Sequence, residues 1–99
     1  MYNLIYHPLV KEDLKQLNNS IRIEVFKKIE KIKLSPELGK PLGNKNGMNL
    51  TGLLKVYVAK KSIRIVYEII NDVLVIKVIA IGKREDMLVY KQAEARKDN

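Results

Sequence analysis

The sequence predicts an α+β fold, in which two helices precede a β-meander and a short helix follows it. Two early segments repeat apolar residues three or four positions apart, which is the spacing of an amphipathic helix. Three later segments are rich in Val and Ile, and only short polar links separate them: residues 53–60, 62–70 and 73–82. With 99 residues, 46% of them apolar, the chain can form one core, so we expect a single domain over residues 1–99.

The N-terminal part predicts a strand that leads into a helix. Residues 2–6 are β-prone and stop at His7-Pro8, and proline suits the first turn of a helix because that turn needs no N–H from it. The apolar stripe of this helix is Val10, Leu14 and Leu17. Polar residues, Asp13 among them, are expected on the solvated face. We interpret His7, the single histidine, as a junction or capping residue.

A second helix is predicted from about Ile21, antiparallel to the first. Asn18-Asn19-Ser20 supplies a helix end and then an N-cap hydroxyl. The apolar stripe that follows is Ile21, Val25, Ile29 and Ile32. Ser35-Pro36 ends this helix, because a residue before proline avoids the α region. Residues 39–47 contain three glycines and predict a long irregular loop, and residues 85–97 predict a last, partly exposed helix.

The hairpin turns predict which side chains share a face of the sheet. A turn at Lys60-Lys61 pairs Tyr57 with Arg64 and Lys55 with Val66. A turn at Asn71-Asp72 would place Arg64 beside Ile79 and Val66 beside Lys77. Alternation then separates a nearly all-apolar face, to be covered by the helices, from a face with four basic or tyrosine side chains. That second face holds Lys55, Tyr57, Arg64 and Lys77, and would also expose Val66, Ile79 and Ile81.

The charge of the chain indicates a polyanionic ligand. Nineteen Lys and Arg residues against 11 Asp and Glu give a formal net charge of +8. There is no cysteine, which excludes a disulfide framework and a thiolate metal site, and neither carboxylate pairs nor His clusters mark the meander. No apolar run approaches the roughly 20 residues of a membrane span. We therefore expect a cytoplasmic protein that binds nucleic acid and needs neither metal nor cofactor.

Several short motifs resemble the RelE branch of the RelE/ParE toxin family. They are Leu50-Thr51-Gly52, Lys55, Arg64-Ile65-Val66-Tyr67, Gly82-Lys83-Arg84-Glu85 and Val89-Tyr90. The order of elements, β-α-α-β-β-β-α with an antiparallel sheet, resembles that family over the whole chain. The resemblance implies a toxin of a type II toxin–antitoxin pair that cleaves mRNA in the ribosomal A site. It also implies an acidic antitoxin that covers the basic face or displaces the final helix.

The resemblance also implies roles for individual residues. Lys55 and Arg64 would stabilise the phosphate, Arg84 would stabilise charge or act as the acid, and Tyr90 would stack on or orient a nucleotide. Lys60, Lys61, Lys77 and Lys83 are further RNA-binding candidates. Attack of a ribose 2′-OH on the adjacent phosphate would give a 2′,3′-cyclic phosphate and a free 5′-OH without a metal ion.

One position departs from the family pattern. Tyr57 stands where the pattern has a second lysine that is often assigned as the general base. An unperturbed tyrosine has a pKa of about 10 and is a poor base at neutral pH, so adjacent cations, Arg64 above all, would have to lower it. Lys55 is the other candidate base. Two alternatives stay open: a ParE-like, non-enzymatic gyrase inhibitor, and a basic RNA-binding module with little turnover.

Overall fold

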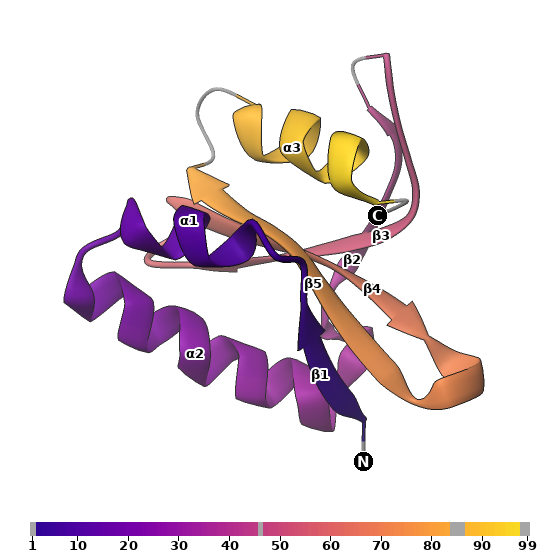
Figure 1. Cartoon of the computed structure of the whole chain (residues 1–99), viewed down its shortest axis with the longest axis horizontal. Helices are drawn as coiled ribbons and strands as arrows, with labels where there is room; N and C mark the ends of the chain where they lie inside the picture. Colours follow the sequence, from indigo (N-terminus) through magenta and orange to yellow (C-terminus); the bar gives the residue numbers. More distant parts are fainter. Residues whose placement is uncertain (1, 46, 84–86, 98–99) are drawn as a thin grey trace.

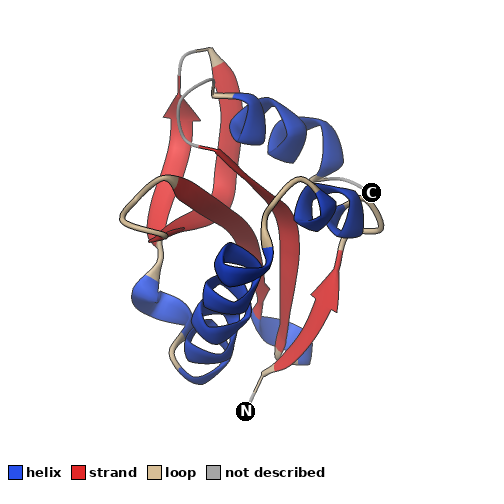
Figure 2. Cartoon of the chain, turned by 90° about the vertical axis from the view of Figure 1, so that its left-hand side faces the viewer, coloured by secondary structure: helices blue, strands red, loops and turns tan. Residues whose placement is uncertain are grey.

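In the computed structural model, which describes residues 2–45, 47–83 and 87–97, a mixed five-stranded sheet lies between two layers of helix (Figure 1). The elements are β1 (Asn3–Tyr6), α1 (Val10–Lys15), α2 (Asn19–Leu34), β2 (Lys40–Lys45), β3 (Met48–Val58), β4 (Ile63–Ile70), β5 (Val75–Lys83) and α3 (Leu88–Arg96), with short 3₁₀ turns at Pro36–Leu38 and Asn71–Val73. The α+β class is confirmed. The strand order is β1-β5-β4-β3-β2, and Figure 2 shows the strands as a twisted sheet.

Two features of the sheet differ from the prediction. The first strand, β1, pairs in parallel with β5, so the sheet is mixed rather than antiparallel. The segment predicted as a loop contains β2, which forms a hairpin with β3. Pro41 and Gly43 hid this strand from sequence reasoning, but both are tolerated on an edge strand, and a register irregularity lies between them.

The helical hairpin of α1 and α2 covers one face of the sheet, as predicted. Its core unites Val25, Ile29 and Ile32 of α2 with Ile65 and Tyr67 of β4. The cap of α2 is Asn18 instead of the predicted Ser20, because the Asn18 side chain accepts a hydrogen bond from the Ile21 N–H at 3.0 Å.

The other face was predicted to be exposed, and that prediction was wrong. The short helix α3 packs on it and encloses a second core. This core contains Met48, Leu50, Leu53, Val66, Ile79, Ala80, Val89, Tyr90 and Ala93. Val66 and Ile79 are therefore buried beneath α3, while Ile81 is buried in the first core, on the opposite face.

The pairing of β4 with β5 also differs from the prediction, because the connection is longer than two residues. After the 3₁₀ turn, Leu74 takes a left-handed conformation, and β5 starts at Val75. Glu68 pairs with Lys77 and Tyr67 with Val78, and a bulge then shifts the register so that Val66 pairs with Ala80. Arg64 lies opposite Gly82 rather than Ile79. The bulge places Ala80 under α3, whereas the predicted alternation would put it on the face that α1 and α2 cover.

Candidate active site

The hairpin of β3 and β4 brings three predicted site residues together. Tyr57 pairs with Arg64 and Lys55 with Val66, so the predicted register of this hairpin is confirmed. Residues two apart on a strand share a face, which places Lys55 beside Tyr57. The three side chains form one cluster at the end of the sheet near the β3–β4 turn.

Arg64 lies at the centre of this cluster and is almost fully buried, with 6% of its surface exposed. Its guanidinium carbon is 4.7 Å from the centroid of the Tyr90 ring and 5.3 Å from that of the Tyr57 ring. Nε and Nη1 of Arg64 are buried and have no hydrogen-bond partner among the described residues. A buried cation with unused donors is costly to a fold, so this group is suited to receive an anionic ligand.

The hydroxyl of Tyr57 is more acidic than that of an ordinary tyrosine. The Lys55 ammonium donates a hydrogen bond from Nζ to the Tyr57 Oη at 2.8 Å. That bond lowers the pKa of the Tyr57 hydroxyl to about 8, with a further contribution from the charge of Arg64. Adjacent cations were expected to have this effect, but Lys55 contributes more to it than Arg64.

Tyr90 has the opposite environment. It is fully buried in the second core, and this burial raises the pKa of its hydroxyl. Its ring packs against the Arg64 guanidinium. In this arrangement, neither face of the Tyr90 ring is open for stacking on a nucleotide. Tyr90 instead supports the Arg64 guanidinium by packing against it.

A basic rim surrounds the cluster at the β3–β4 turn. Lys60 and Lys61 are exposed at the turn and Lys83 at the end of β5. Together with Arg64 they line a hollow of about 570 Å³, whose apolar wall includes Ile21 and Met87. The turn residues Ala59, Lys60 and Lys61 all have positive φ, which is unfavourable for residues other than glycine. This backbone conformation determines the direction in which the two lysine side chains leave the turn.

Comparison with known proteins identifies the family. The model for the ParE toxin of the parDE type II toxin–antitoxin system matches residues 4–88. The chain belongs to the RelE/ParE toxin family. No curated protein matches the sequence.

Similar solved structures assign this toxin to the RelE branch. A mutant of the E. coli toxin RelE in the free state is 26% identical, with a TM-score of 0.72 and 93% of each chain covered. RelE in the intact E. coli RelBE toxin–antitoxin complex is 26% identical, with a TM-score of 0.68, and the match covers 86% of this chain and 99% of that chain. The archaeal RelE–RelB complex from Pyrococcus horikoshii OT3, at 16% identity and a TM-score of 0.65, shares the fold, over 86% of this chain and 97% of that chain.

Two predicted residues of the toxin are not part of the described cluster. Lys77 pairs with Glu68, five positions along β5 from the Gly82 that faces Arg64. Its charge lowers the pKa of His7, after burial and the charge of Arg96. Arg84 lies outside the described residues.

Two cations outside the predicted site residues flank the site of the toxin. Lys28 of α2 and Lys40 of β2 line a second hollow of about 290 Å³, together with Lys55, Tyr57 and Lys61. Lys28 is one of several basic residues on α2 that were expected on a solvated face, as positioning candidates at most, and helix periodicity does not distinguish it from the others. Lys40 gave no signal because its strand was not predicted.

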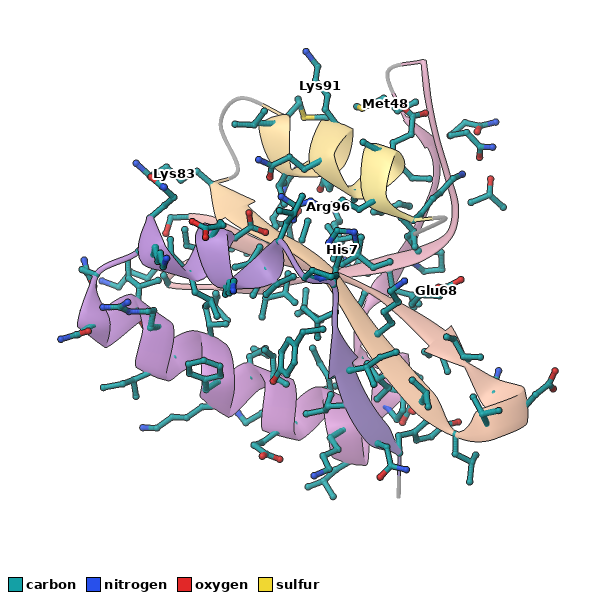
Figure 3. All side chains as sticks on the ribbon, viewed as in Figure 1. His7, Met48, Glu68, Lys83, Lys91 and Arg96 are labelled. Carbon is teal, nitrogen blue, oxygen red and sulfur yellow. The ribbon has the colours of Figure 1, made fainter. Side chains whose placement is uncertain are left out.

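His7 has a structural role, as its position before Pro8 suggested. Its Nδ1 accepts a hydrogen bond from the Leu9 N–H at 3.1 Å, which fixes the turn into α1. Burial lowers its pKa, and Figure 3 shows it beside Arg96, away from Lys83 at the end of β5.

The described part of this toxin contains no group of three or more His, Cys, Asp or Glu side chains that could hold a metal ion. Within the same residues, no helix is long and apolar enough to cross a membrane.

Proposed function

We propose that this toxin is a ribosome-dependent endoribonuclease that cleaves mRNA in the A site. The observation that carries the proposal is the buried Arg64 guanidinium, whose Nε and Nη1 have no partner among the described residues and lie beside the Lys55–Tyr57 pair. A phosphate group satisfies such donors better than any neutral ligand, because the hydrogen bonds are charge-assisted. The apolar and cationic hollow next to it suits a nucleotide, which joins a base to a phosphate.

The proposed reaction uses side chains of the chain for each proton transfer and for charge stabilisation. The Tyr57 phenolate takes the proton of a ribose 2′-OH, and the 2′-oxygen attacks the adjacent phosphorus. Arg64 and Lys55 stabilise the charge that develops on the phosphate oxygens. The bond from phosphorus to the 5′-oxygen breaks, and that oxygen takes up a proton, with Arg84 as the proposed charge stabiliser or acid. The products are a 2′,3′-cyclic phosphate and a 5′-OH end.

The remaining basic residues would bind the backbone of the RNA. Lys60, Lys61 and Lys83 surround the hollow and can neutralise phosphates on either side of the cleaved bond. In this proposal, ribosomal RNA holds the message against this rim. The toxin would act in the cytoplasm. Lys77 is proposed as a weaker RNA contact, since it lies further along the sheet.

The proposed inhibitory partner is a cognate acidic antitoxin. Structures of relatives contain RelE together with the antitoxin RelB. An acidic segment over the basic rim would block the hollow and neutralise part of the net charge of +8.

Mapping of RNA breaks after induction of the toxin tests the proposal. Primer extension on a translated message should show breaks at fixed positions within codons, and an untranslated copy of the same RNA should stay intact. The second candidate, a gyrase inhibitor, is favoured by the ParE description of the matching family model. Intact message together with arrested replication would support that candidate and refute the nuclease.

A further inference from the structure

We propose that Asp13 and Arg96 are positioning residues that hold α3, and with it Tyr90, in place against Arg64. The inference rests on the proposed endoribonuclease site, because Tyr90 supports the arginine of that site. Arg96 is the last residue of α3, and Asp13 lies in α1. Their side chains form a two-pronged ion pair, with Nη1 2.7 Å from Oδ2 and Nη2 3.1 Å from Oδ1. Each residue is 7% exposed.

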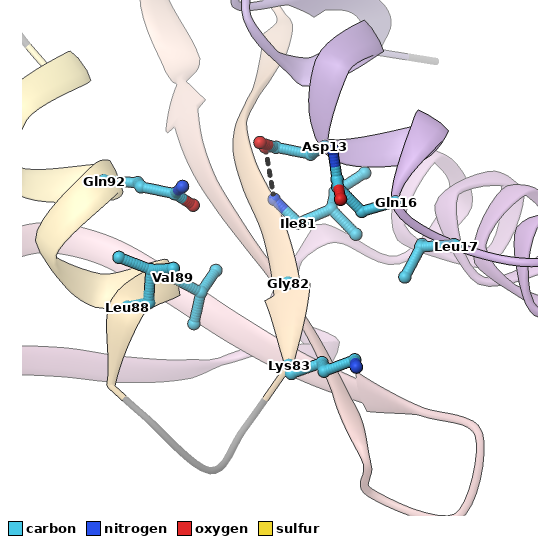
Figure 4. A pocket seen from close by; sticks show the side chains of 9 residues that line it. All are labelled: Asp13, Gln16, Leu17, Ile81, Gly82, Lys83, Leu88, Val89 and Gln92. Atoms are coloured by element: carbon cyan, nitrogen blue, oxygen red, sulfur yellow. Dashed lines mark hydrogen bonds between the residues drawn. The ribbon is translucent and has the colours of Figure 1, made fainter.

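The ion pair occupies the edge of β5 at the point where β1 ends. Pairing of β1 with β5 stops at Tyr6 and Val78, and the His7 N–H then donates to the Val78 carbonyl. Beyond this point, Arg96 Nη1 donates to the Ile79 carbonyl at 3.1 Å. Asp13 Oδ2 accepts from the Ile81 N–H at 3.0 Å (Figure 4). Asp13 and Arg96 therefore take the place of a neighbouring strand.

This edge contact stabilises the bulge that gives β5 its register. The bulge lies next to Ile79 and puts Ala80 and Gly82 on the face that α3 covers. An added Cβ at position 82 would lie 3.2 Å from the Val89 Cβ, which is tighter than an ordinary van der Waals contact. The first turn of α3 thus lies close to β5, and the next residue, Tyr90, lies against Arg64.

Helix α3 needs the contact with Asp13 because its length and its N-terminus give it little stability of its own. It has nine residues, a length at which an isolated helix is marginal in water. Among the described residues, no side chain caps its N-terminus, where Met87 has positive φ. A cleft of about 230 Å³ separates it from α1 over the end of β5 (Figure 4). The ion pair bridges the two helices beside this cleft.

The position of Arg64 can be measured without any assay of cleavage. The Arg64 guanidinium lies close to two tyrosine rings. The ring currents of these tyrosines shift its side-chain NMR signals away from those of a free arginine. Arg96→Lys keeps the charge but cannot make two parallel hydrogen bonds to Asp13. Asp13→Asn keeps an acceptor for Ile81 and loses the charge. In both variants, we expect the Arg64 signals to move toward free arginine while the rest of the spectrum stays folded.

Two control variants separate positioning from simple loss of stability. Glu94→Gln removes the charge of an exposed contact of α3 with the Asn49 N–H, and Ile29→Val weakens the first core. Neither should move the Arg64 signals. With cleavage assayed as well, Arg96→Lys should lower the maximal rate about 10- to 100-fold with ribosome binding unchanged, as expected when reacting groups are misplaced.

The two measurements fail independently. Arg64 signals that stay in place in both variants would overturn the positioning role, whatever the cleavage rate. Signals that move equally in Ile29→Val would also overturn it, because general loss of stability would then explain the shift. If the signals move as expected but the wild-type toxin cleaves no translated message, the positioning role stands and the proposed nuclease function fails.

Discussion

The two faces of the sheet differ in how completely their buried polar groups are paired. Under α1 and α2, the hydroxyl of Tyr67 accepts from the Gly39 N–H at 2.8 Å and donates to the Pro36 carbonyl at 2.5 Å. Under α3, Arg64 is buried with two nitrogens that have no partner among the described residues. The first face is built for stability, and the second holds donors ready for a ligand at a cost in stability.

The same contrast separates Tyr57 from Tyr67, which lie on neighbouring strands and opposite faces. The Lys55 hydrogen bond lowers the pKa of Tyr57 to about 8, whereas burial raises that of Tyr67. Groups whose environments push their pKa values apart are suited to different tasks. Substitutions on each face therefore test whether the two faces have different tasks.

The largest effect is expected from Tyr57→Phe. This change removes the proposed base and leaves the ring that packs against Arg64, so cleavage should fall by about 10²- to 10⁴-fold while ribosome binding is kept. Rates with translating ribosomes and a pull-down of ribosomes measure the two quantities. Near-normal cleavage would transfer the role of base to Lys55.

The next effect is expected from Arg64→Leu, which should change activity and stability in opposite directions. Loss of the proposed phosphate donors should lower cleavage by about 10²- to 10³-fold. Two nitrogens of this buried cation have no hydrogen-bond partner among the described residues. Replacing it by an apolar side chain should therefore raise the free energy of unfolding by about 1 kcal/mol. Urea denaturation measures the stability, and a clear loss of stability would show that Arg64 is needed for folding.

The pH dependence of cleavage should follow the Tyr57 hydroxyl. A base with a pKa of about 8 is mostly protonated at pH 7, so the rate should rise about tenfold between pH 7 and pH 9 and then level off. Lys55→Met removes the hydrogen bond that contributes most to the lowered pKa, and should move the midpoint upward toward the ordinary value for tyrosine. A rate that does not depend on pH in this range would exclude Tyr57 as the base.

The sequence was sufficient to predict strand pairing at the candidate site where a local pattern determines that pairing. The pairing of Tyr57 with Arg64 follows from the alternation of side chains on either side of the Lys60-Lys61 turn, and it was predicted correctly. The β4–β5 register was not predictable in this way. Its bulge is bound by Asp13, 68 positions from Ile81 in the chain, and Asp13 pairs with Arg96, 83 positions away.

The second core was missed for a related reason. Alternation identified Val66 and Ile79 as neighbours of the basic residues, but a short helix with few apolar residues gave no signal that it would cover them. Burial beneath α3 is what brings Tyr90 to Arg64 and makes the guanidinium a buried one. Long-range packing, which periodicity does not report, thus created the electrostatic character of the site.

The smallest effect on activity is expected from Tyr67→Phe, which removes the same atom as Tyr57→Phe but on the other face. Gly39 N–H and the Pro36 carbonyl would lose their partner inside the protein, so the free energy of unfolding should fall by about 1–3 kcal/mol. Cleavage per folded molecule should be unchanged, because Tyr67 lies in the core beneath α2. Thermal unfolding and single-turnover cleavage measure the two effects. If Tyr67→Phe lowered cleavage as far as Tyr57→Phe does, the two faces would not have separate roles in stability and activity. Loss of either hydroxyl would then lower cleavage by disturbing the whole fold.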